Sequence, residues 1–216
     1  MQKTKLVIFD LDGTLFRTET VDIDAFNGAF RQNGFAERTA EEILSMIGVP
    51  LEGICTGLLR TNDRHVINKI KSDVIKLEDI LIEEKGELYP GVIDFLKRLK
   101  QAGFTLCICS NGNEEYVLKI AEKFRLPDYF GTIWFEKAGI TKSNAVGILK
   151  EKYQADKFIM VGDRSSDINA ATDNGGVSIG ALYGFSVEEA GQADYKAENI
   201  AEVEEVIRSL DGESYF

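Results

Sequence analysis

The segment Leu6–Leu15 reads LVIFDLDGTL, and it joins an apolar run to two closely spaced carboxylates. Leu6–Phe9 is apolar without interruption, which is typical of a strand buried on both faces of a parallel sheet. Asp10 and Asp12 follow directly, so they lie at the carboxyl end of this strand, where open α/β sheets place their ligand crevice. Because a buried unpaired charge is costly, we expect these two acids to serve a ligand or a reaction.

A second apolar run, Phe104–Cys109, also ends in polar residues. Ser110, Asn111 and Gly112 follow it and supply a hydroxyl and backbone N–H groups where a helix is expected to begin. Helix N-termini bind anions because their free N–H groups and the helix dipole favour negative charge. We therefore expect an anion site here, although an ordinary turn with an N-cap would use the same residue types.

Two further segments add a cation and more acids. Lys157–Val161 predicts another buried strand, and GDRSSD follows it, with acids at Asp163 and Asp167. Lys142 begins a segment with the apolar spacing of a helix, although a lone Lys is more often a solvated surface residue. Each of the four polar groups could be structural by itself, but their order after predicted strands indicates one shared site.

These four segments resemble the motifs of the haloacid dehalogenase-like (HAD) hydrolases, and the likeness to phosphoglycolate phosphatase-like members covers essentially the whole chain. FDLDGTL resembles motif I, Ser110-Asn111-Gly112 motif II, Lys142 motif III and GDRSSD motif IV. The resemblance implies that Asp10 is a covalent nucleophile and that Asp12 is a general acid and base. It implies a Mg²⁺ ion held by Asp10, Asp163 and the backbone carbonyl of Asp12. Asp167 would be a further ligand or would contact one of the ligands. The phosphoryl group would be bound by Ser110, Asn111, Gly112 and Lys142.

The strands alternate with helix-period segments, which predicts an α/β fold with a doubly wound parallel sheet. Shorter strands are expected at Thr132–Phe135 and Val177–Gly180, whereas residues 16–89 carry only helix signals. The resemblance implies a Rossmann-like HAD core, residues 1–15 and 90–216, with a small all-helical cap, residues 16–89, inserted after the first strand. A lid directly after the nucleophile would control the access of water to an acyl phosphate.

Composition narrows the class of protein. The net charge of the 216 residues is −11, which argues against a nucleic-acid partner. No run of 18 apolar residues could span a membrane, and Met1–Thr4 leads straight into the first strand, without room for a signal peptide. Cys55, Cys107 and Cys109 lack metal-ligand spacing and are expected to be core hydrophobes in a reduced compartment. We therefore expect a cytoplasmic protein, and the resemblance implies a monomer or small homo-oligomer that acts on a small phosphorylated metabolite.

Together these features predict a Mg²⁺-dependent phosphatase that hydrolyses a small phosphomonoester through an aspartyl-phosphate. A sugar-phosphate mutase resembling β-phosphoglucomutase stays open, although Leu51 stands where such mutases carry an Arg for the second phosphate. A dehalogenase would lack the second acid of motif I, and a calcium-binding loop would need a late Glu. A non-enzymatic binding module would release no phosphate.

Three features are left undecided or outside the mechanism. Arg17 stands where many relatives have Asp, and it is either a surface or hinge residue or reaches toward an anionic substrate group. The loop Gly48–Gly53 contains one acid and neither Lys nor Arg, so it offers no cation for a second phosphate. His65, the one histidine, lies in the predicted cap, which disfavours histidine-based acid–base chemistry.

Overall fold

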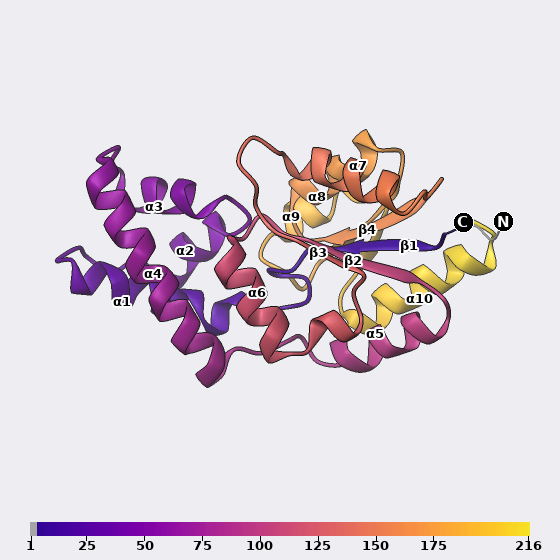
Figure 1. Cartoon of the computed structure of the whole chain (residues 1–216), viewed down its shortest axis with the longest axis horizontal. Helices are drawn as coiled ribbons and strands as arrows, with labels where there is room; N and C mark the ends of the chain where they lie inside the picture. Colours follow the sequence, from indigo (N-terminus) through magenta and orange to yellow (C-terminus); the bar gives the residue numbers. More distant parts are fainter. Residues whose placement is uncertain (1–3) are drawn as a thin grey trace.

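Residues 4–216 are described by a computed structural model, in which strands and helices alternate along the chain (Figure 1). The prediction made for Met1–Thr4 lies outside the described residues except at Thr4. The strands are β1 (Leu6–Phe9), β2 (Thr105–Cys109), β3 (Thr132–Trp134), β4 (Phe158–Gly162), β5 (Val177–Ala181) and β6 (Tyr195–Ala197). The α-helices are α1 (Asp22–Gln32), α2 (Ala40–Met46), α3 (Leu51–Leu59), α4 (Arg64–Lys85), α5 (Val92–Gln101), α6 (Glu114–Lys123), α7 (Lys142–Lys152), α8 (Ser165–Asp173), α9 (Val187–Ala190) and α10 (Ile200–Gly212). Two 3₁₀ turns are η1 (Thr18–Thr20) and η2 (Leu126–Asp128).

Within residues 4–216 the six strands form one parallel sheet in the order β3-β2-β1-β4-β5-β6. β1 lies in the middle, where Leu6 is paired with Thr105 of β2 and with Phe158 of β4. All four residues of β1 are buried, as its uninterrupted apolar sequence predicts. The strand order reverses beside β1, so the doubly wound α/β fold is confirmed, and its topological switch point lies where Asp10 follows the strand.

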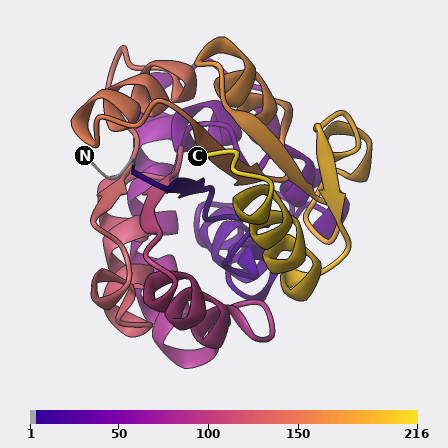
Figure 2. The ribbon, with the colours of Figure 1, turned by 90° about the vertical axis from the view of Figure 1, so that its right-hand side faces the viewer.

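Helices cover both faces of the sheet, because successive strand residues point to opposite sides. Val7 and Phe9 belong to a core shared with helices α5, α6 and α10, whereas Leu6 and Ile8 pack with helices α7 and α8. Figure 1 shows α7 and α8 above the sheet and α5 and α10 below it, and Figure 2 shows these layers from one end. Cys107 and Cys109 are buried without a disulfide, as expected of small core residues.

The insertion between β1 and β2, helices α1–α4, forms a separate bundle beside the sheet (Figure 1). It has its own apolar core, to which Phe26, Phe30 and Ile70 contribute fully buried side chains. The two connecting segments run side by side, since the N–H of Arg17 donates to the Glu87 carbonyl at 2.9 Å and the N–H of Tyr89 to the Leu15 carbonyl at 2.9 Å. The division into domains at residues 15/16 and 89/90 stays a prediction.

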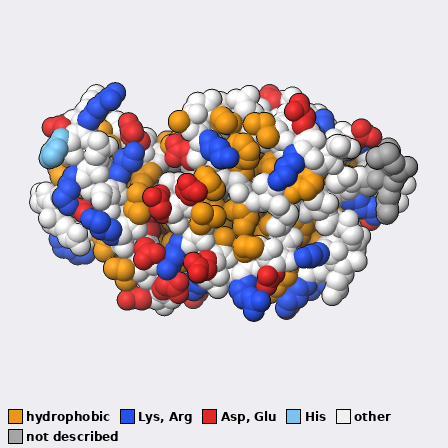
Figure 3. Space-filling model, viewed as in Figure 1, with side chains coloured by type: hydrophobic (Ala, Val, Ile, Leu, Met, Phe, Trp, Pro, Cys, Tyr) orange, Lys and Arg blue, Asp and Glu red, His pale blue; other side chains and the backbone are white. Residues whose placement is uncertain are grey.

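Lysine side chains of α6, which packs on the sheet, form ion pairs and hydrogen bonds with α4 of the insertion. Acidic side chains gather where α4 and α6 meet on the face shown in Figure 3, and there Lys119 forms ion pairs with Asp79 at 3.2 Å and Glu83 at 3.1 Å. Lys123 donates to carbonyls at the C-terminal end of α4, including that of Gly86 at 2.9 Å, where a cation also complements the helix dipole. Among residues 4–216 we find no helix whose length and hydropathy suit a transmembrane segment.

Candidate active site

The turn after β1 brings the two motif acids against the next central strand. The N–H of Asp10 donates to the Val161 carbonyl of β4 at 2.8 Å, and the chain then folds back on itself at Gly13. Gly13 has φ +74°, and a Cβ there would lie only 2.6 Å from Asp163 Oδ2. Glycine is therefore required at this position by both backbone conformation and space, and it lets the loop pack directly on Asp163.

Three carboxylates, one from the segment after β1 and two from the segment after β4, converge beside this turn. One oxygen each of Asp10, Asp163 and Asp167 lies within 4.8 Å of the others. Lys142, the first residue of α7, places Nζ 2.6 Å from Asp10 Oδ1 and 2.5 Å from Asp167 Oδ1. All four side chains are buried, and they come from the ends of β1 and β4 and the beginnings of α7 and α8. The structure thus brings four of the sequence-predicted site residues together.

Asp163 and Asp167 are fixed by backbone groups. The N–H of Phe185 donates to Asp163 Oδ2 at 2.7 Å, and the N–H of Arg164 donates to Asp167 Oδ2 at 3.0 Å. A Cβ on Gly162 would lie 2.2 Å from Asp167 Cγ, so the glycine of GDRSSD provides the space that Asp167 occupies. Asp163 Oδ1 is buried and accepts no hydrogen bond from any described residue. A buried carboxylate oxygen without a partner is a ready ligand for a cation.

The local charge favours a divalent cation. Burial raises the pKa of Asp10 well above its usual value, and Lys142 opposes this rise. Burial and the neighbouring Asp167 raise the pKa of Asp163 to about 7. Although burial acts to lower the pKa of Lys142, Asp10 and Asp167 raise it, so this lysine carries its charge. One lysine cannot neutralise three carboxylates, and oxygen ligands of this kind fit Mg²⁺.

The carboxyl group of Asp12 lies outside the three-carboxylate group and has its own hydrogen bonds. Its Oδ1 accepts from the Tyr116 hydroxyl at 2.6 Å and from the Thr18 hydroxyl at 2.7 Å, while Ser110 Oγ lies 3.5 Å from Oδ2. Burial raises the pKa of Asp12, and the hydrogen bonds from Tyr116 and Thr18 oppose that rise. A carboxyl group held in this way, beside but not within a cation site, can exchange a proton with a bound molecule.

The predicted anion site lies between β2 and α6. Ser110 is buried directly after β2, and its hydroxyl accepts the N–H of Gly112 at 2.9 Å. The side chain of Asn111 donates to the Gly48 carbonyl of the insertion at 2.9 Å, so this amide connects the insertion to the sheet edge. Asn113 caps α6 by accepting the N–H of Tyr116 at 3.0 Å, and α6 therefore begins beside the acids.

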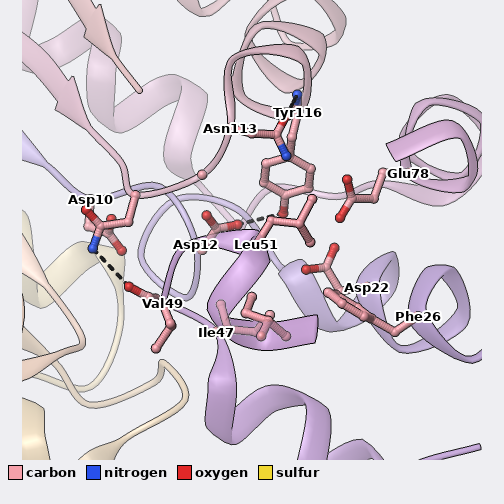
Figure 4. A pocket seen from close by; sticks show the side chains of 14 residues that line it. Asp10, Asp12, Asp22, Phe26, Ile47, Val49, Leu51, Glu78, Asn113 and Tyr116 are labelled. Carbon is pink, nitrogen blue, oxygen red and sulfur yellow. Dashed lines mark hydrogen bonds between the residues drawn. The ribbon is translucent and has the colours of Figure 1, made fainter. Parts of the chain in front are cut away.

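A pocket lies between the insertion and the carboxyl edge of the sheet (Figure 4). Both parts of the chain contribute its walls, and Leu51, which is predicted to stand where mutases carry an Arg, is one of the residues from the insertion. Among the described residues that line it there is neither Lys nor Arg. The lining consists of Asp10, Asp12, Asp22, Phe26, Ile47, Gly48, Val49, Leu51, Ile54, Glu78, Asn111, Gly112, Asn113 and Tyr116.

Sequence reasoning missed four polar residues of this pocket, Asp22, Glu78, Asn113 and Tyr116. Two of these residues, Asp22 and Glu78, could have been found from the pattern of apolar residues in the sequence. Asp22 precedes Ala25 and Phe26 on the apolar face of α1, and Glu78 continues, four residues after Val74, the apolar face of α4. A carboxylate on the buried face of an amphipathic helix is the exception that marks a functional position. Tyr116 left no such signal, because a tyrosine on an apolar helix face usually contributes only to packing.

Arg17 and His65 are not among the residues that line the pocket. Arg17 forms ion pairs with Glu19 at 2.9 Å and with Glu87 at 2.7 Å, so it is a surface residue at the connection to the insertion. His65 is exposed in the first turn of α4. Neither side chain belongs to the pocket.

Comparisons with known proteins agree with this architecture. The family of haloacid dehalogenase-like hydrolases matches residues 7–181. The phosphoglycolate phosphatase of Vibrio vulnificus is 30% identical over an alignment of 225 positions, which covers 95% of this chain and 97% of that protein. The phosphoglycolate phosphatase of Agrobacterium fabrum is 33% identical over 193 residues, 84% of this chain and 82% of that protein. A crystal structure of a "predicted phosphatase from Clostridium acetobutylicum" superposes with a TM-score of 0.84 at 24% identity, and covers 97% of this chain and 100% of that one.

Proposed function

We propose that this chain, which belongs to the haloacid dehalogenase-like hydrolases and is a phosphatase of that family, hydrolyses a small phosphomonoester with Mg²⁺ through an aspartyl-phosphate. The observation that carries the proposal is the placement of Asp10. Its Oδ1 lies 2.6 Å from the Lys142 ammonium, and its carboxylate belongs to a buried group with Asp163 and Asp167. A carboxylate can attack a dianionic phosphoryl group only where cations cancel the repulsion between them.

In the first step a carboxylate oxygen of Asp10 attacks phosphorus, and the bond from phosphorus to the ester oxygen breaks. The departing alkoxide takes the proton of Asp12 and leaves as the free alcohol. Lys142 offsets the negative charge shared by Asp10 and the phosphoryl group. Ser110 and the backbone N–H of Asn111 are proposed to hold the other phosphoryl oxygens at the beginning of α6.

In the second step Asp12, now ionised, takes a proton from a water molecule as that water attacks the phosphorus of the aspartyl-phosphate. The bond between phosphorus and the Asp10 oxygen breaks, which releases orthophosphate and restores the carboxylate. The same group thus acts as acid and then as base, and the second step returns Asp12 to its protonated form. Tyr116 and Thr18 orient the carboxyl group for both steps.

The residues present fit a divalent cation. Asp10 and Asp163 would hold it directly, together with the backbone carbonyl of Asp12, and Asp167 would be a further ligand or would contact one of the ligands. The unpaired Asp163 Oδ1 supports this assignment. When bound, the ion supplies positive charge that stabilises the phosphoryl oxygens during transfer.

The pocket lining argues against the mutase alternative. A mutase must bind a bisphosphate at both ends, and the second phosphate needs fixed cationic donors. Leu51 is apolar, and no described residue lining the pocket is a Lys or Arg. Water is therefore proposed as the normal acceptor of the phosphoryl group.

A panel of small phosphomonoesters, assayed for orthophosphate release, tests the proposal. We expect steady release with Mg²⁺, loss of release in a chelator, and recovery when Mg²⁺ is restored. Ca²⁺ should support little turnover because its larger, more flexible coordination spoils in-line geometry. Full activity in the chelator would refute the metal assignment. Rapid glucose 6-phosphate formation from β-glucose 1-phosphate with catalytic glucose 1,6-bisphosphate would favour the mutase.

A further inference from the structure

Two carboxyl groups of the insertion, those of Asp22 and Glu78, face the pocket and each has one buried oxygen without a hydrogen-bond partner. Asp22, at the beginning of α1, and Glu78, in α4, are each 4% exposed. Asp22 Oδ1 and Glu78 Oε2 are buried and accept no hydrogen bond from any described residue. Figure 4 shows the two carboxyl groups facing the same space beside the Tyr116 ring. Buried acids are normally paired, so these two positions call for a ligand that donates to them.

None of the described residues lining the pocket is a Lys or Arg, whereas Asp10, Asp12, Asp22 and Glu78 contribute four carboxyl groups. The lysine beside Asp10 pairs with Asp10 and Asp167, and it lies on the side of the three-carboxylate group. The half of the pocket formed by the insertion therefore carries acids, and no basic side chain on its described walls pairs with them.

Asp22 and Glu78 lie near the place where the leaving group of the substrate is expected. The Tyr116 hydroxyl donates to Asp12 Oδ1 at 2.6 Å, and Asp12 is the residue proposed to protonate the departing oxygen. In Figure 4 the Tyr116 hydroxyl lies between Asp12 and the pair formed by Asp22 and Glu78. With the phosphoryl group beside Asp10, as the proposed mechanism requires, the alcohol part of the ester would extend past Asp12 toward the two acids.

We propose that Asp22 and Glu78 bind a primary ammonium group on the alcohol part of the substrate, so that the enzyme prefers the phosphate ester of a short amino alcohol. This inference rests on the proposed phosphatase function and names its substrate class. An ammonium group supplies three donors and a positive charge, which match two carboxyl groups that each have an unpartnered oxygen. A carboxylate at the same place, as in phosphoglycolate, would find no cation among the described lining residues and would be repelled by either acid in its ionised form.

Three esters of nearly equal size test the charge preference directly. O-phosphoethanolamine carries an ammonium group, 2-hydroxyethyl phosphate a hydroxyl group, and phosphoglycolate a carboxylate. We expect kcat/KM to fall in that order, with the ammonium ester at least roughly tenfold above the hydroxyl ester, as a charged hydrogen bond would give. Equal or better use of the hydroxyl ester or of phosphoglycolate would overturn the inference while leaving the phosphatase function standing. If the enzyme hydrolysed none of the three esters and not p-nitrophenyl phosphate either, the phosphatase function itself would be refuted.

Isosteric variants locate the preference. Asp22→Asn and Glu78→Gln each remove one group that can ionise beside a bound ammonium and should bring the ratio of kcat/KM for the ammonium and hydroxyl esters toward one. Glu84→Gln is the matched control, because Glu84 is exposed on the same helix as Glu78 and does not line the pocket. An unchanged ratio in both pocket variants would contradict the assignment. If either variant fails to fold, inhibition of the unaltered enzyme decides: 2-aminoethylphosphonate should inhibit more strongly than ethylphosphonate, and equal inhibition would reject the ammonium site.

Discussion

The Tyr116 hydroxyl donates a hydrogen bond of 2.6 Å to Asp12 Oδ1, and it thereby ties the first helix after β2 to the acid that follows β1. The Tyr116 ring also packs against Phe16 in an edge-on contact, with ring centroids 6.3 Å apart. The hydroxyl is thus held by a buried ring rather than by a mobile side chain. A hydrogen bond to a carboxylate stabilises its ionised form, so Tyr116 acts on the proton affinity of Asp12.

Removing that hydroxyl should shift the pH dependence of turnover. The hydrogen bond from Tyr116 lowers the pKa of Asp12 against the effect of burial, so Tyr116→Phe should raise that pKa. The step that needs ionised Asp12 should then reach half its maximum at a higher pH, and kcat near neutral pH should fall. The exposed Tyr195, changed to Phe, is the control. A pH profile of kcat that is unchanged in Tyr116→Phe would separate Tyr116 from the proton transfer.

The effect of Mg²⁺ on thermal stability should grow with pH. The pKa of Asp163 is raised from 3.8 to about 7 in the folded protein without metal. Between these values the folded state binds more protons than the unfolded state, so stability in a chelator should fall as the pH rises through this range. Mg²⁺ must displace those protons, and we expect it to raise the melting temperature more at pH 8 than at pH 5. Equal shifts at both pH values, or the same shifts in Asp163→Asn, would contradict the assignment of the metal site.

Arg164 should control how firmly the insertion rests on the sheet edge. Its Nη2 donates to the Leu44 carbonyl of α2 at 2.7 Å, while Nη1 pairs with Glu189 at 3.1 Å. Arg164→Met should loosen this contact, raise KM several-fold and speed hydrogen–deuterium exchange across residues 44–49. The exposed Arg125, which pairs with Asp128, gives the control variant Arg125→Met. Exchange at the rate of the unaltered protein would mean that Arg164 does not hold the insertion in place.

The central strands could be predicted well from the sequence, because strands buried on both faces consist of uninterrupted apolar residues. The uninterrupted apolar runs at β1, β2 and β4 were placed within one or two residues, and the acids that follow them converge as their shared position at strand ends required. The edge strand β6 was missed, since Tyr195 and Lys196 are exposed and leave no apolar run. The short helix α9 was missed as well, because a single turn is too short to show a helical period.

The pocket was harder to predict than the acids at the sheet edge. Its walls depend on how the insertion packs against the sheet, through contacts such as that between Asn111 and the Gly48 carbonyl, which no local pattern encodes. Asp22 and Glu78 did leave a trace as carboxylates on apolar helix faces. Arg17 shows the opposite case, since its departure from the familiar motif leads only to surface ion pairs.

The covalent role of Asp10 is the central claim, and trapping the phospho-enzyme tests it most directly. The protein is mixed with Mg²⁺ and a hydrolysed phosphomonoester, quenched in acid within one turnover, digested, and analysed by mass spectrometry. We predict one phosphoryl group on the peptide that contains Asp10 and neither adduct nor turnover in Asp10→Asn. Asp12→Asn should retain the metal site while turnover falls by about 10²–10⁴-fold. Orthophosphate release by Asp10→Asn at a rate near that of the unaltered enzyme, or a phosphoryl group on another residue, would contradict the account.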